Sequence, residues 1–324
     1  MSPTIALLLG LVLLFFGGEV LVKGSVALAL RMRISTLVVG MTVVSFATSA
    51  PELFVSLQAV LGGSNDIAFG NVIGSNIANI TLVLGITALI FRVKISDQTA
   101  NLNYPVLLLA SLLFGGVMYF FNGIPTWVGF VFLALLLLFT WSLITRSRKE
   151  SLQDTSEVLS EAKNDSLFKS LGFLLAGIVL LKFGADYLVE GTVEIARMFD
   201  VSERVIAVTV VAIGTSIPEL ATSIVAALKK EDNLAIGNLI GSNIFNILAV
   251  LGVVASVKEI SIIDTAILSF DYVYMIIITF ILGLFIYTFS KRQISRKEGV
   301  ILLLIYISYL YFSIYSFNFW AFIS

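Results

Sequence analysis

The sequence predicts an all-α integral membrane protein with ten transmembrane helices, arranged as two inverted-topology repeats of five helices each. Hydrophobic residues make up 58% of the 324 residues and charged residues only 13%, whereas soluble domains carry about 25% charged residues. Several apolar segments reach the roughly 20 residues that cross a bilayer as a helix. In addition, the two halves of the chain match each other at one fixed offset.

Ten apolar segments alternate with mostly short polar connections, as expected for packed antiparallel helices. They cover residues 4–30, 35–61, 66–91, 103–121, 125–145, 168–196, 202–228, 233–256, 269–290 and 298–320. The first segment follows no basic region and is too long for the core of a signal peptide. We therefore expect it to be retained as a transmembrane helix.

The longest polar stretch, from Arg146 to Lys169, predicts a linker with a short surface helix at SEVLSEAK. The expected organisation is a first repeat over 1–146, a linker over 147–167 and a second repeat over 168–324. Related motif regions lie at 40–80 and 207–247.

The distribution of Lys and Arg predicts the orientation. If the N-terminus is external, fifteen of the twenty Lys and Arg residues fall in cytoplasmic loops and only Arg197, Arg204 and Lys258 in external loops. Cytoplasmic loops are the ones enriched in Lys and Arg. We expect a multi-pass protein of the cell membrane, with both termini external and the linker cytoplasmic.

The internal repeat is ungapped over some 65 residues, with every match 167 positions apart. The matched pairs are FGGEVLVKGS from Phe16 with FGADYLVEGT from Phe183, ATSAPEL from Ala47 with GTSIPEL from Gly214, and AFGNVIGSNIANI from Ala68 with AIGNLIGSNIFNI from Ala235. Because five is odd, the second copy enters the membrane from the opposite side. Inverted repeats are common in secondary transporters, whose substrate sites lie near the midplane at the repeat interface.

Two glutamates occupy corresponding positions deep in apolar segments, Glu52 in the second and Glu219 in the seventh. An acidic residue at such depth costs roughly 2.5–3.5 kcal/mol on insertion scales. Neither motif contains a Lys or Arg, so a bound cation is the expected partner. A protonated, hydrogen-bonded structural glutamate is the alternative.

Oxygen-bearing side chains surround each glutamate. Thr48 and Thr215 precede the glutamates by four residues and share their helix faces. Ser49 and Ser216 are adjacent to these threonines. An isolated Ser or Thr in a membrane helix usually hydrogen-bonds its own backbone, but the repetition favours ligands here.

A proline precedes each glutamate, Pro51 and Pro218. Proline removes a helical hydrogen bond and clashes with the carbonyl four residues back. We expect loosened turns over Ser45–Ala47 and Ala212–Gly214 whose carbonyls are available to a cation. The alternative is a simple packing kink.

The third and eighth segments combine close-packing glycines with polar residues. Gly70 with Gly74, and Gly237 with Gly241, permit close helix contact. Packing does not explain the Ser and Asn residues four positions apart, which are Ser75 with Asn79 and Ser242 with Asn246.

The resulting ligand inventory contains oxygen alone, which suits a hard cation such as Ca²⁺ and argues against Zn²⁺ or Cu²⁺. It does not separate Ca²⁺ from Na⁺. The chain has no cysteine and no histidine. No nucleophile–base set or nucleotide motif is visible, so neither an enzyme nor a bound cofactor is expected. No basic stripe predicts nucleic-acid binding.

The motifs GMTVVSFATSAPELFVS and AVTVVAIGTSIPELATS, with the two GN-x-IGSN-I segments, resemble the calcium/cation antiporter superfamily, specifically the bacterial and archaeal sodium/calcium exchangers. The resemblance covers nearly the whole chain. It implies Na⁺-driven Ca²⁺ transport through four sites between segments 2, 3, 7 and 8, with segments 1 and 6 as a sliding pair.

By resemblance, Glu52 and Glu219 are the central ligands shared by Ca²⁺ and Na⁺. Further ion ligands are implied at Thr48, Thr215, Ser75 and Ser242, with assistance from Ser49, Ser216, Asn79 and the carbonyls of Ser45 and Ala212. Asn246 stands where several relatives have Asp, so the site carries two formal negative charges. This leaves stoichiometry and the involvement of K⁺ or protons open.

The expected mechanism is alternating access by a protein that works as a monomer in the bilayer, with Ca²⁺ and Na⁺ as its only required partners. Gly17, Gly18, Gly24, Gly184 and Gly191 are expected to thin the sliding interface. Ion pairs are expected between Glu19 and Lys23 and between Asp186 and Lys182, with the alternative that both acids face the ion pathway. Proton-coupled or K⁺-dependent antiport on the same fold, and a channel, are the alternatives.

Overall fold

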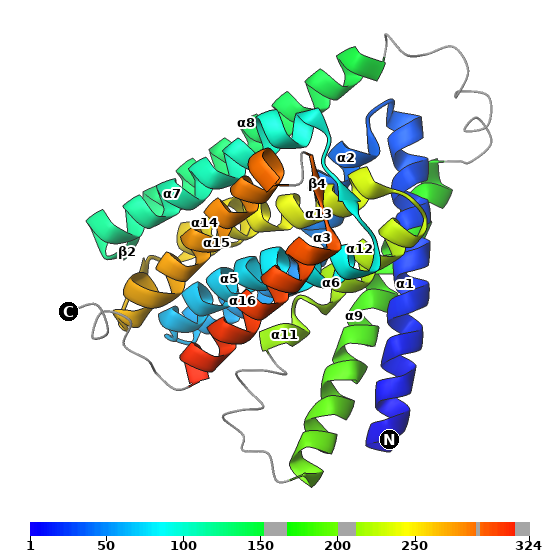
Figure 1. The fold of residues 1–324 in the computed structure, drawn as a ribbon. Coiled ribbons are helices and arrows are strands. Elements are labelled where there is room, and N and C mark those ends of the chain that lie inside the picture. The colour runs from blue at the N-terminus through cyan, green and yellow to red at the C-terminus, as the bar shows by residue number, and fades with distance from the viewer. Residues whose placement is uncertain (152–166, 200–211, 290–291, 315–324) are drawn as a thin grey trace. The chain divides into compact units, whose positions relative to one another are not determined.

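The computed structural model describes residues 1–151, 167–199, 212–289 and 292–314 (Figure 1). The predicted SEVLSEAK helix, the start of the seventh segment and the end of the tenth lie outside this range. The described residues are almost entirely helical, as the sequence predicts. Seven helical stretches are long and apolar enough to span a membrane: 3–32, 65–90, 99–121, 126–149, 167–198, 232–257 and 267–289.

One further span in the described residues is broken. Residues 36–48 and 50–61 are together long and apolar enough to span a membrane as a helix bent by 43°, which raises the total to eight. The seventh segment is described over 212–228, and its main helix, Ile217–Leu228, is too short to span a membrane alone. The structure thus confirms a helical membrane protein with several spans.

The chain forms two compact units, and each takes residues from both halves of the sequence. Unit 1 comprises 1–48 and 139–241, and unit 2 comprises 49–138 and 242–324. Two long helices, α8 (Thr126–Ser151) and α13 (Asp232–Phe245), contribute residues to both units.

Unit 1 is built around two long helices that lie alongside each other, α1 (Pro3–Met32) and α9 (Leu167–Met198). Its shorter helices are α2 (Thr36–Val39), the π-helical turn η1 (Gly40–Val44), α3 (Ser45–Thr48), α11 (Ala212–Gly214) and α12 (Ile217–Leu228). At 1.5 Å per residue, α1 is longer than the roughly 30 Å hydrocarbon core. It can therefore span the bilayer and extend beyond it.

Glycines bring α1 and α9 into backbone contact. A Cβ on Gly17 would lie 2.8 Å from the amide nitrogen of Leu181, and one on Gly184 would lie 2.8 Å from that of Leu14. These contacts are reciprocal, because Gly184 and Leu181 lie 167 positions after Gly17 and Leu14. Their order shows that the two helices run antiparallel.

Two further reciprocal glycine pairs extend this interface along both helices. Gly10 and Gly177 form one pair, against Leu188 and Leu21, and Gly24 and Gly191 form the other. The first pair was not in the predicted set, although Gly10 precedes Gly17, and Gly177 precedes Gly184, by the same seven residues that separate the predicted glycines. Gly18 faces α12 in the seventh segment, as predicted for the interface between the sliding pair and its neighbours, and a Cβ there would lie 2.9 Å from Val225 Cγ2. The other four predicted glycines lie instead in the contact between α1 and α9.

One of the two predicted ion pairs is present. Lys182 Nζ lies 2.7 Å from Asp186 Oδ2. The pairing of Glu19 with Lys23 is wrong, because Glu19 Oε1 lies 3.0 Å from Lys229 Nζ at the end of α12. Lys23 instead lies over the ring of Phe173, 4.8 Å from its centroid.

Unit 2 contains most of the remaining helices and two short antiparallel strand pairs. In chain order its elements are α4 (Ala50–Leu61), α5 (Asn65–Ala78), η2 (Asn79–Val83), α6 (Leu84–Ile90), β1 (Val93–Lys94), η3 (Thr99–Asn103), α7 (Tyr104–Phe121), β2 (Gly123–Ile124), η7 (Asn246–Val250), α14 (Leu251–Val257), β3 (Ile260–Ser261), η8 (Ile267–Tyr272), α15 (Val273–Leu284), η9 (Phe285–Phe289), β4 (Gln293–Ile294) and α16 (Arg296–Ile314).

The local structure of unit 2 repeats with the sequence offset. The π-helical turns η2 and η7, the helices α6 and α14, and the strands β1 and β3 each begin 167 residues apart. The strands pair reciprocally, β1 with β4 and β2 with β3. Each strand that follows a third segment therefore meets the strand that follows a fourth segment of the other repeat.

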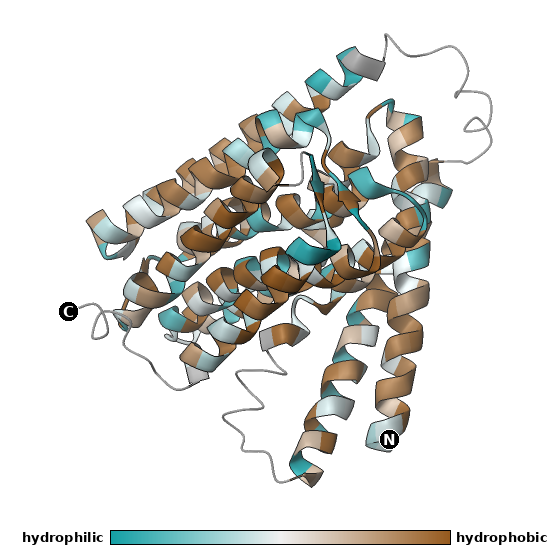
Figure 2. Cartoon of the chain, in the orientation of Figure 1, coloured by the Kyte–Doolittle hydropathy of each residue, from teal (hydrophilic) through white to brown (hydrophobic). Residues whose placement is uncertain are grey.

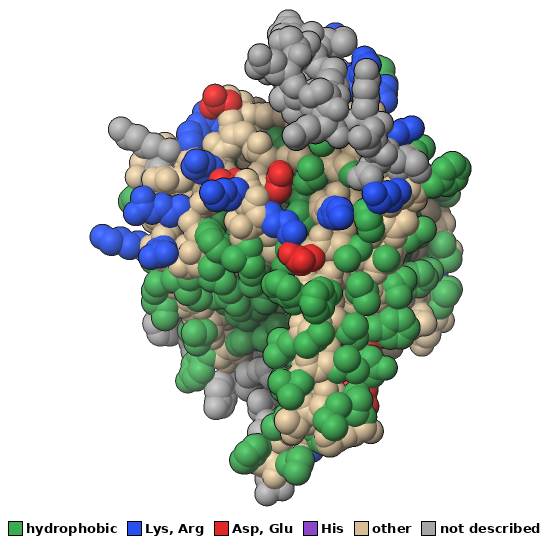
Figure 3. All heavy atoms as spheres, turned by 90° about the vertical axis from the view of Figure 1, so that its right-hand side faces the viewer, with side chains coloured by type: hydrophobic (Ala, Val, Ile, Leu, Met, Phe, Trp, Pro, Cys, Tyr) green, Lys and Arg blue, Asp and Glu red, His purple; other side chains and the backbone are tan. Residues whose placement is uncertain are grey.

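The surface of the long helices suits a lipid environment. The exposed large apolar residues of α1 include Ile5, Leu8, Val12 and Phe15. Figure 2 shows that the long helices are mainly hydrophobic along their length. Hydrophobic side chains also cover much of the face shown in Figure 3. Exposed apolar surface on this scale would be unfavourable in water.

Stability at acidic pH should depend on Glu231, in the connection between α12 and α13. Burial raises the pKa of this carboxyl, and a hydrogen bond with the Thr36 side chain partly opposes the shift. Since the native state holds the proton more tightly, stability should fall as pH rises from the unfolded-state pKa to the raised native pKa. In detergent, the melting temperature of Glu231→Gln should depend less on pH between these two pKa values than that of the unmodified protein. An unchanged profile would contradict this assignment.

Candidate ion-binding site

The two proline–glutamate turns have the same local structure. After α3, Ser49 takes φ −84° and ψ 3°, and α4 begins at the next residue. In the second copy, Ser216 takes φ −90° and ψ 2° before α12 begins. Each proline occupies the first turn of the new helix, where its missing N–H costs no hydrogen bond. The motif therefore breaks the helix twice in the same way.

The break lies later than predicted. The turns expected to loosen, Ser45–Ala47 and Ala212–Gly214, are helical in α3 and α11. Proline is compatible with the start of a helix, so the irregular backbone falls directly before each new helix, at Ser49 and at 215–216. A π-helical turn, η1, lies upstream of the first break.

Glu52 and Glu219 are the third residues of α4 and α12 and are fully buried, each with 0% exposure. The N-terminus of a helix carries a partial positive charge that stabilises a carboxylate. Among the described residues there is no group of three or more Asp, Glu, His or Cys that could hold a metal ion.

Six of the twelve predicted ligands lie in unit 1: Ser45, Thr48, Ala212, Thr215, Ser216 and Glu219. The helix that carries Glu219, α12, packs against α3, which carries Ser45 and Thr48. The Oγ of Ser216 is buried and has no hydrogen-bond partner among the described residues.

Asn238 of α13 accepts hydrogen bonds from two of these ligands. Thr48 Oγ1 donates to Asn238 Oδ1 at 3.2 Å, and Ser45 Oγ lies 3.1 Å from the Asn238 carbonyl oxygen. Ser45 Oγ also lies 2.8 Å from the Gly40 carbonyl oxygen. Both hydroxyls direct their protons to acceptors in the protein, and the Ser45 carbonyl oxygen, which is the predicted ligand of that residue, lies 3.4 Å from Thr48 Oγ1.

The glycines of the eighth segment allow α13 to pack closely against the second segment. A Cβ on Gly237 would lie 2.6 Å from Leu37 O, and one on Gly241 would lie 2.7 Å from the Cα of Met41. The predicted close contact is confirmed at these two glycines. A Cβ on Gly70 or Gly74 would meet no described atom within 4 Å.

The other six predicted ligands lie in unit 2: Ser49, Glu52, Ser75, Asn79, Ser242 and Asn246. The helix that carries Glu52, α4, packs against α5, which carries Ser75, and against η7, which begins at Asn246. All six side chains are at most 3% exposed.

Several polar atoms of this second set have no hydrogen-bond partner among the described residues. They are Ser49 Oγ, both amide atoms of Asn79 and Asn246 Oδ1. A buried polar group left without a partner costs roughly 1–3 kcal/mol. Cation binding would satisfy the oxygens, so these residues fit a hard-cation site.

Four asparagines of the repeated GN-x-IGSN segment were missing from the predicted set: Asn71, Asn76, Asn238 and Asn243. Asn71 Nδ2 donates to Glu52 O at 3.1 Å and to Ser56 Oγ at 3.0 Å. The internal repeat could have identified them, because Asn71 and Asn76 recur 167 positions later as Asn238 and Asn243.

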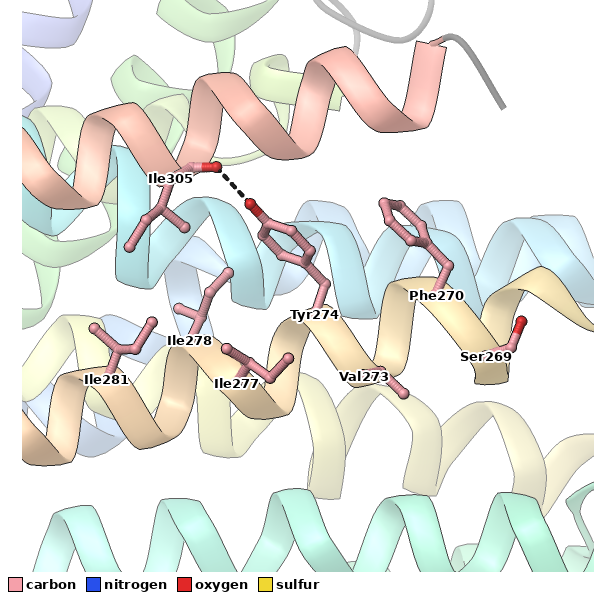
Figure 4. Close-up of a pocket in the computed structure, with 8 residues that line it drawn as sticks. All are labelled: Ser269, Phe270, Val273, Tyr274, Ile277, Ile278, Ile281 and Ile305. Atoms are coloured by element: carbon pink, nitrogen blue, oxygen red, sulfur yellow. Dashed lines mark hydrogen bonds between the residues drawn. The ribbon is translucent and has the colours of Figure 1, made fainter. Parts of the chain in front are cut away.

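An apolar pocket in unit 2 is unsuited to cations. It has a volume of about 160 Å³ and is lined mainly by α15, with Ile305 of α16 and Ser269 and Phe270 of η8 (Figure 4). Its Tyr274 hydroxyl donates to Ile305 O at 2.8 Å. None of the described residues that line this pocket carries a carboxylate.

A helical membrane protein with buried carboxylates and neutral oxygens at repeated positions has the architecture of a cation transporter. The chain belongs to the sodium/calcium exchanger family, because the family model described as "Sodium/calcium exchanger protein" matches residues 2–145 and 169–315. The family and the fold are those of transporters, not enzymes.

Similar proteins match nearly the whole chain. The putative antiporter CaxA of Alkalimonas amylolytica is 39% identical and covers 95% of this chain and 97% of its own. The sodium/calcium exchanger MaX1 of Methanosarcina acetivorans is 30% identical, with 94% and 96% coverage. A structure of the sodium-calcium exchanger NCX_Mj, soaked with 10 mM Na⁺ and zero Ca²⁺, matches with a TM-score of 0.80 at 31% identity and covers 94% and 97% of the two chains.

Proposed function

We propose that the protein is a secondary antiporter that exchanges Na⁺ for Ca²⁺ across the membrane by alternating access. The observation that carries the proposal is the pair of fully buried glutamates, Glu52 and Glu219, at corresponding positions of two broken helices. The relatives named sodium/calcium exchanger support the choice of ions.

The proposed architecture is ten transmembrane helices in two repeats of opposite orientation. The reciprocal antiparallel packing of α1 and α9 supports it, because these helices are the first of each repeat. The strand pairing gives independent support. Loops after the third and fourth segments lie on opposite sides of the membrane, yet β1 pairs with β4 and β2 with β3. Pairing of a third-segment loop with a fourth-segment loop of the other repeat is expected if one repeat is inverted, because the two loops then lie on the same side of the membrane.

In the proposed site, Glu52 and Glu219 balance the charge of one Ca²⁺ or of the Na⁺ ions that replace it. The neutral ligands are the main-chain carbonyl oxygens of Ser45 and Ala212 and the side-chain oxygens of Thr48, Thr215, Ser75, Ser242, Ser49, Ser216, Asn79 and Asn246. An oxygen-only set suits Ca²⁺, which takes about 6–8 oxygens in flexible geometry.

Charge compensation explains obligatory exchange. A site holding two uncompensated carboxylates resists removal from water because buried unpaired charges are costly. When ions neutralise the site, α1 and α9 can slide and change the side to which it opens. The glycine contacts between α1 and α9 hold the two helices together as the pair that moves, and Gly18 thins the contact of α1 with α12.

We further propose that the protein works as a monomer in the cell membrane, with external termini and a cytoplasmic linker. The excess of Lys and Arg in the loops assigned to the cytoplasm supports this orientation. The pairing of β1 with β4 joins two loops both assigned to the cytoplasm, and the pairing of β2 with β3 joins two assigned to the outside.

Uptake of ⁴⁵Ca²⁺ into proteoliposomes tests the coupling ion. An outward Na⁺ gradient should drive saturable uptake, whereas proton or K⁺ gradients without Na⁺ should not. Equal uptake driven by a pH gradient without Na⁺ would reject Na⁺ coupling in favour of proton-coupled antiport. Continuous single-channel current would identify a channel.

A further inference from the structure

Three asparagine residues form a continuous hydrogen-bonded chain inside unit 2. Asn246 Nδ2 donates to Asn76 Oδ1 at 3.1 Å, and Asn76 Nδ2 donates to the main-chain oxygen of Asn243 at 3.3 Å. All three side chains are buried, with at most 1% exposure. Asn76 and Asn243 have no place in the ion-binding set proposed above.

The chemistry of this chain fixes the orientation of each amide. A main-chain carbonyl oxygen can only accept, so Asn76 must direct its Nδ2 to Asn243. Its Oδ1 then faces Asn246. Since that oxygen also can only accept, Asn246 must present its Nδ2. A flipped Asn246 would place two oxygens against each other.

The orientation leaves one defined atom for a cation. Asn246 Oδ1 is buried and has no hydrogen-bond partner among the described residues. It belongs to η7, which packs against the helix of Glu52. Asn79, the corresponding residue of the first repeat, has no described hydrogen bond from either amide atom. Its orientation is therefore not fixed in the same way.

We propose that Asn76 is a positioning residue that holds the Asn246 amide with its neutral oxygen directed away from Asn76 and toward the transported ion. This inference rests on the proposed function, because it assumes that Asn246 is an ion ligand. Asn76 does not bind the ion itself. Without it, the amide of Asn246 can rotate and offer N–H groups, which repel a cation.

A double-mutant cycle on Na⁺-driven ⁴⁵Ca²⁺ uptake by the full chain tests the inference. At similar volume, Asn76→Leu removes the hydrogen bonds with Asn243 and Asn246 and the weaker one that Asn76 Nδ2 donates to Met275 Sδ at 3.8 Å. Asn246→Leu removes the proposed ligand. Asn76→Leu should raise the apparent KM for Ca²⁺ by about threefold to tenfold, the net value of a hydrogen bond, with maximal rate within about twofold. The double variant should match Asn246→Leu, because residues that act through one group are not additive.

Thr87→Val is the matched control, because the Thr87 hydroxyl, also in the third segment, donates only to Val83 O at 2.7 Å. Its KM should be unchanged. If Asn76→Leu does not fold, Asn76→Ser, whose shorter side chain cannot make both hydrogen bonds, replaces it in the cycle.

Two results would overturn the positioning role while leaving Asn246 as a ligand: an unchanged KM in the Asn76 variant, or effects that multiply in the double variant. An unchanged KM in Asn246→Leu would remove the ligand and this inference together. Failure of Na⁺ to drive uptake by the unmodified protein would instead contradict the proposed function.

Discussion

Replacing either Glu52 or Glu219 with glutamine is expected to abolish Na⁺-driven Ca²⁺ uptake. Both carboxylates are fully buried, and glutamine keeps the size of the side chain while removing its charge. Leaving a buried charge without one of its partners costs roughly 3–5 kcal/mol, so uptake should fall about 100-fold or more at Ca²⁺ concentrations below saturation. The measurement is ⁴⁵Ca²⁺ uptake by purified variants at matched protein content.

Glu298 offers a matched control for this prediction. It is also a buried glutamate in the first turn of a helix, α16, with 4% exposure. Its Oε2 accepts a hydrogen bond from the Ser295 amide at 2.6 Å, and glutamine can replace it in that helix cap. Glu298→Gln should retain uptake within about twofold of the unmodified protein. At most the strength of one hydrogen bond changes at this position. Near-normal uptake by either Glu52→Gln or Glu219→Gln would contradict the site assignment.

The second large effect is expected at the interface between α1 and α9. An alanine Cβ at Gly184 would lie 2.8 Å from the Leu14 amide nitrogen, so the two helices must separate. Overpacking of this kind typically costs about 1–3 kcal/mol. Gly184→Ala should lower the melting temperature in detergent and slow transport.

Gly172→Ala is the control within the same helix. A Cβ at Gly172 would meet no described atom within 4 Å. Alanine also favours helix over glycine by roughly 1 kcal/mol, so this variant should be at least as stable as the unmodified protein. Equal melting temperatures and transport rates for the two variants would show that the close contact is unimportant.

Features that depend on local chemistry and on the repeat were predictable from the sequence. Apolar length and scarce charge predicted the membrane helices, and the proline before each buried glutamate predicted a broken helix. The glycines of the first and sixth segments predicted close helix contacts, but Gly17, Gly24, Gly184 and Gly191 join these two segments to each other, and of the predicted five Gly18 alone faces α12. The 167-residue register extends this set to Gly10 and Gly177.

Contacts between residues that are distant in sequence were not predictable, because several side chains could have served as the partner. Helical spacing favoured Lys23 as the partner of Glu19, but the end of α12 brings Lys229 to it instead. The position of each break depends on where the following helix can begin, which placed it after 45–47 and 212–214. The role of Asn76 depends on contacts with Asn243 and Asn246, which lie about 170 residues away in sequence.

The central claim is that Glu52 and Glu219 act together on the same Ca²⁺. Calorimetric titration of the purified protein with Ca²⁺ tests it most directly. We expect one Ca²⁺ to bind per chain and to be displaced by Na⁺, and we expect Glu52→Gln and Glu219→Gln each to abolish all binding. Two bound Ca²⁺ per chain, of which each substitution removes only one, would contradict it.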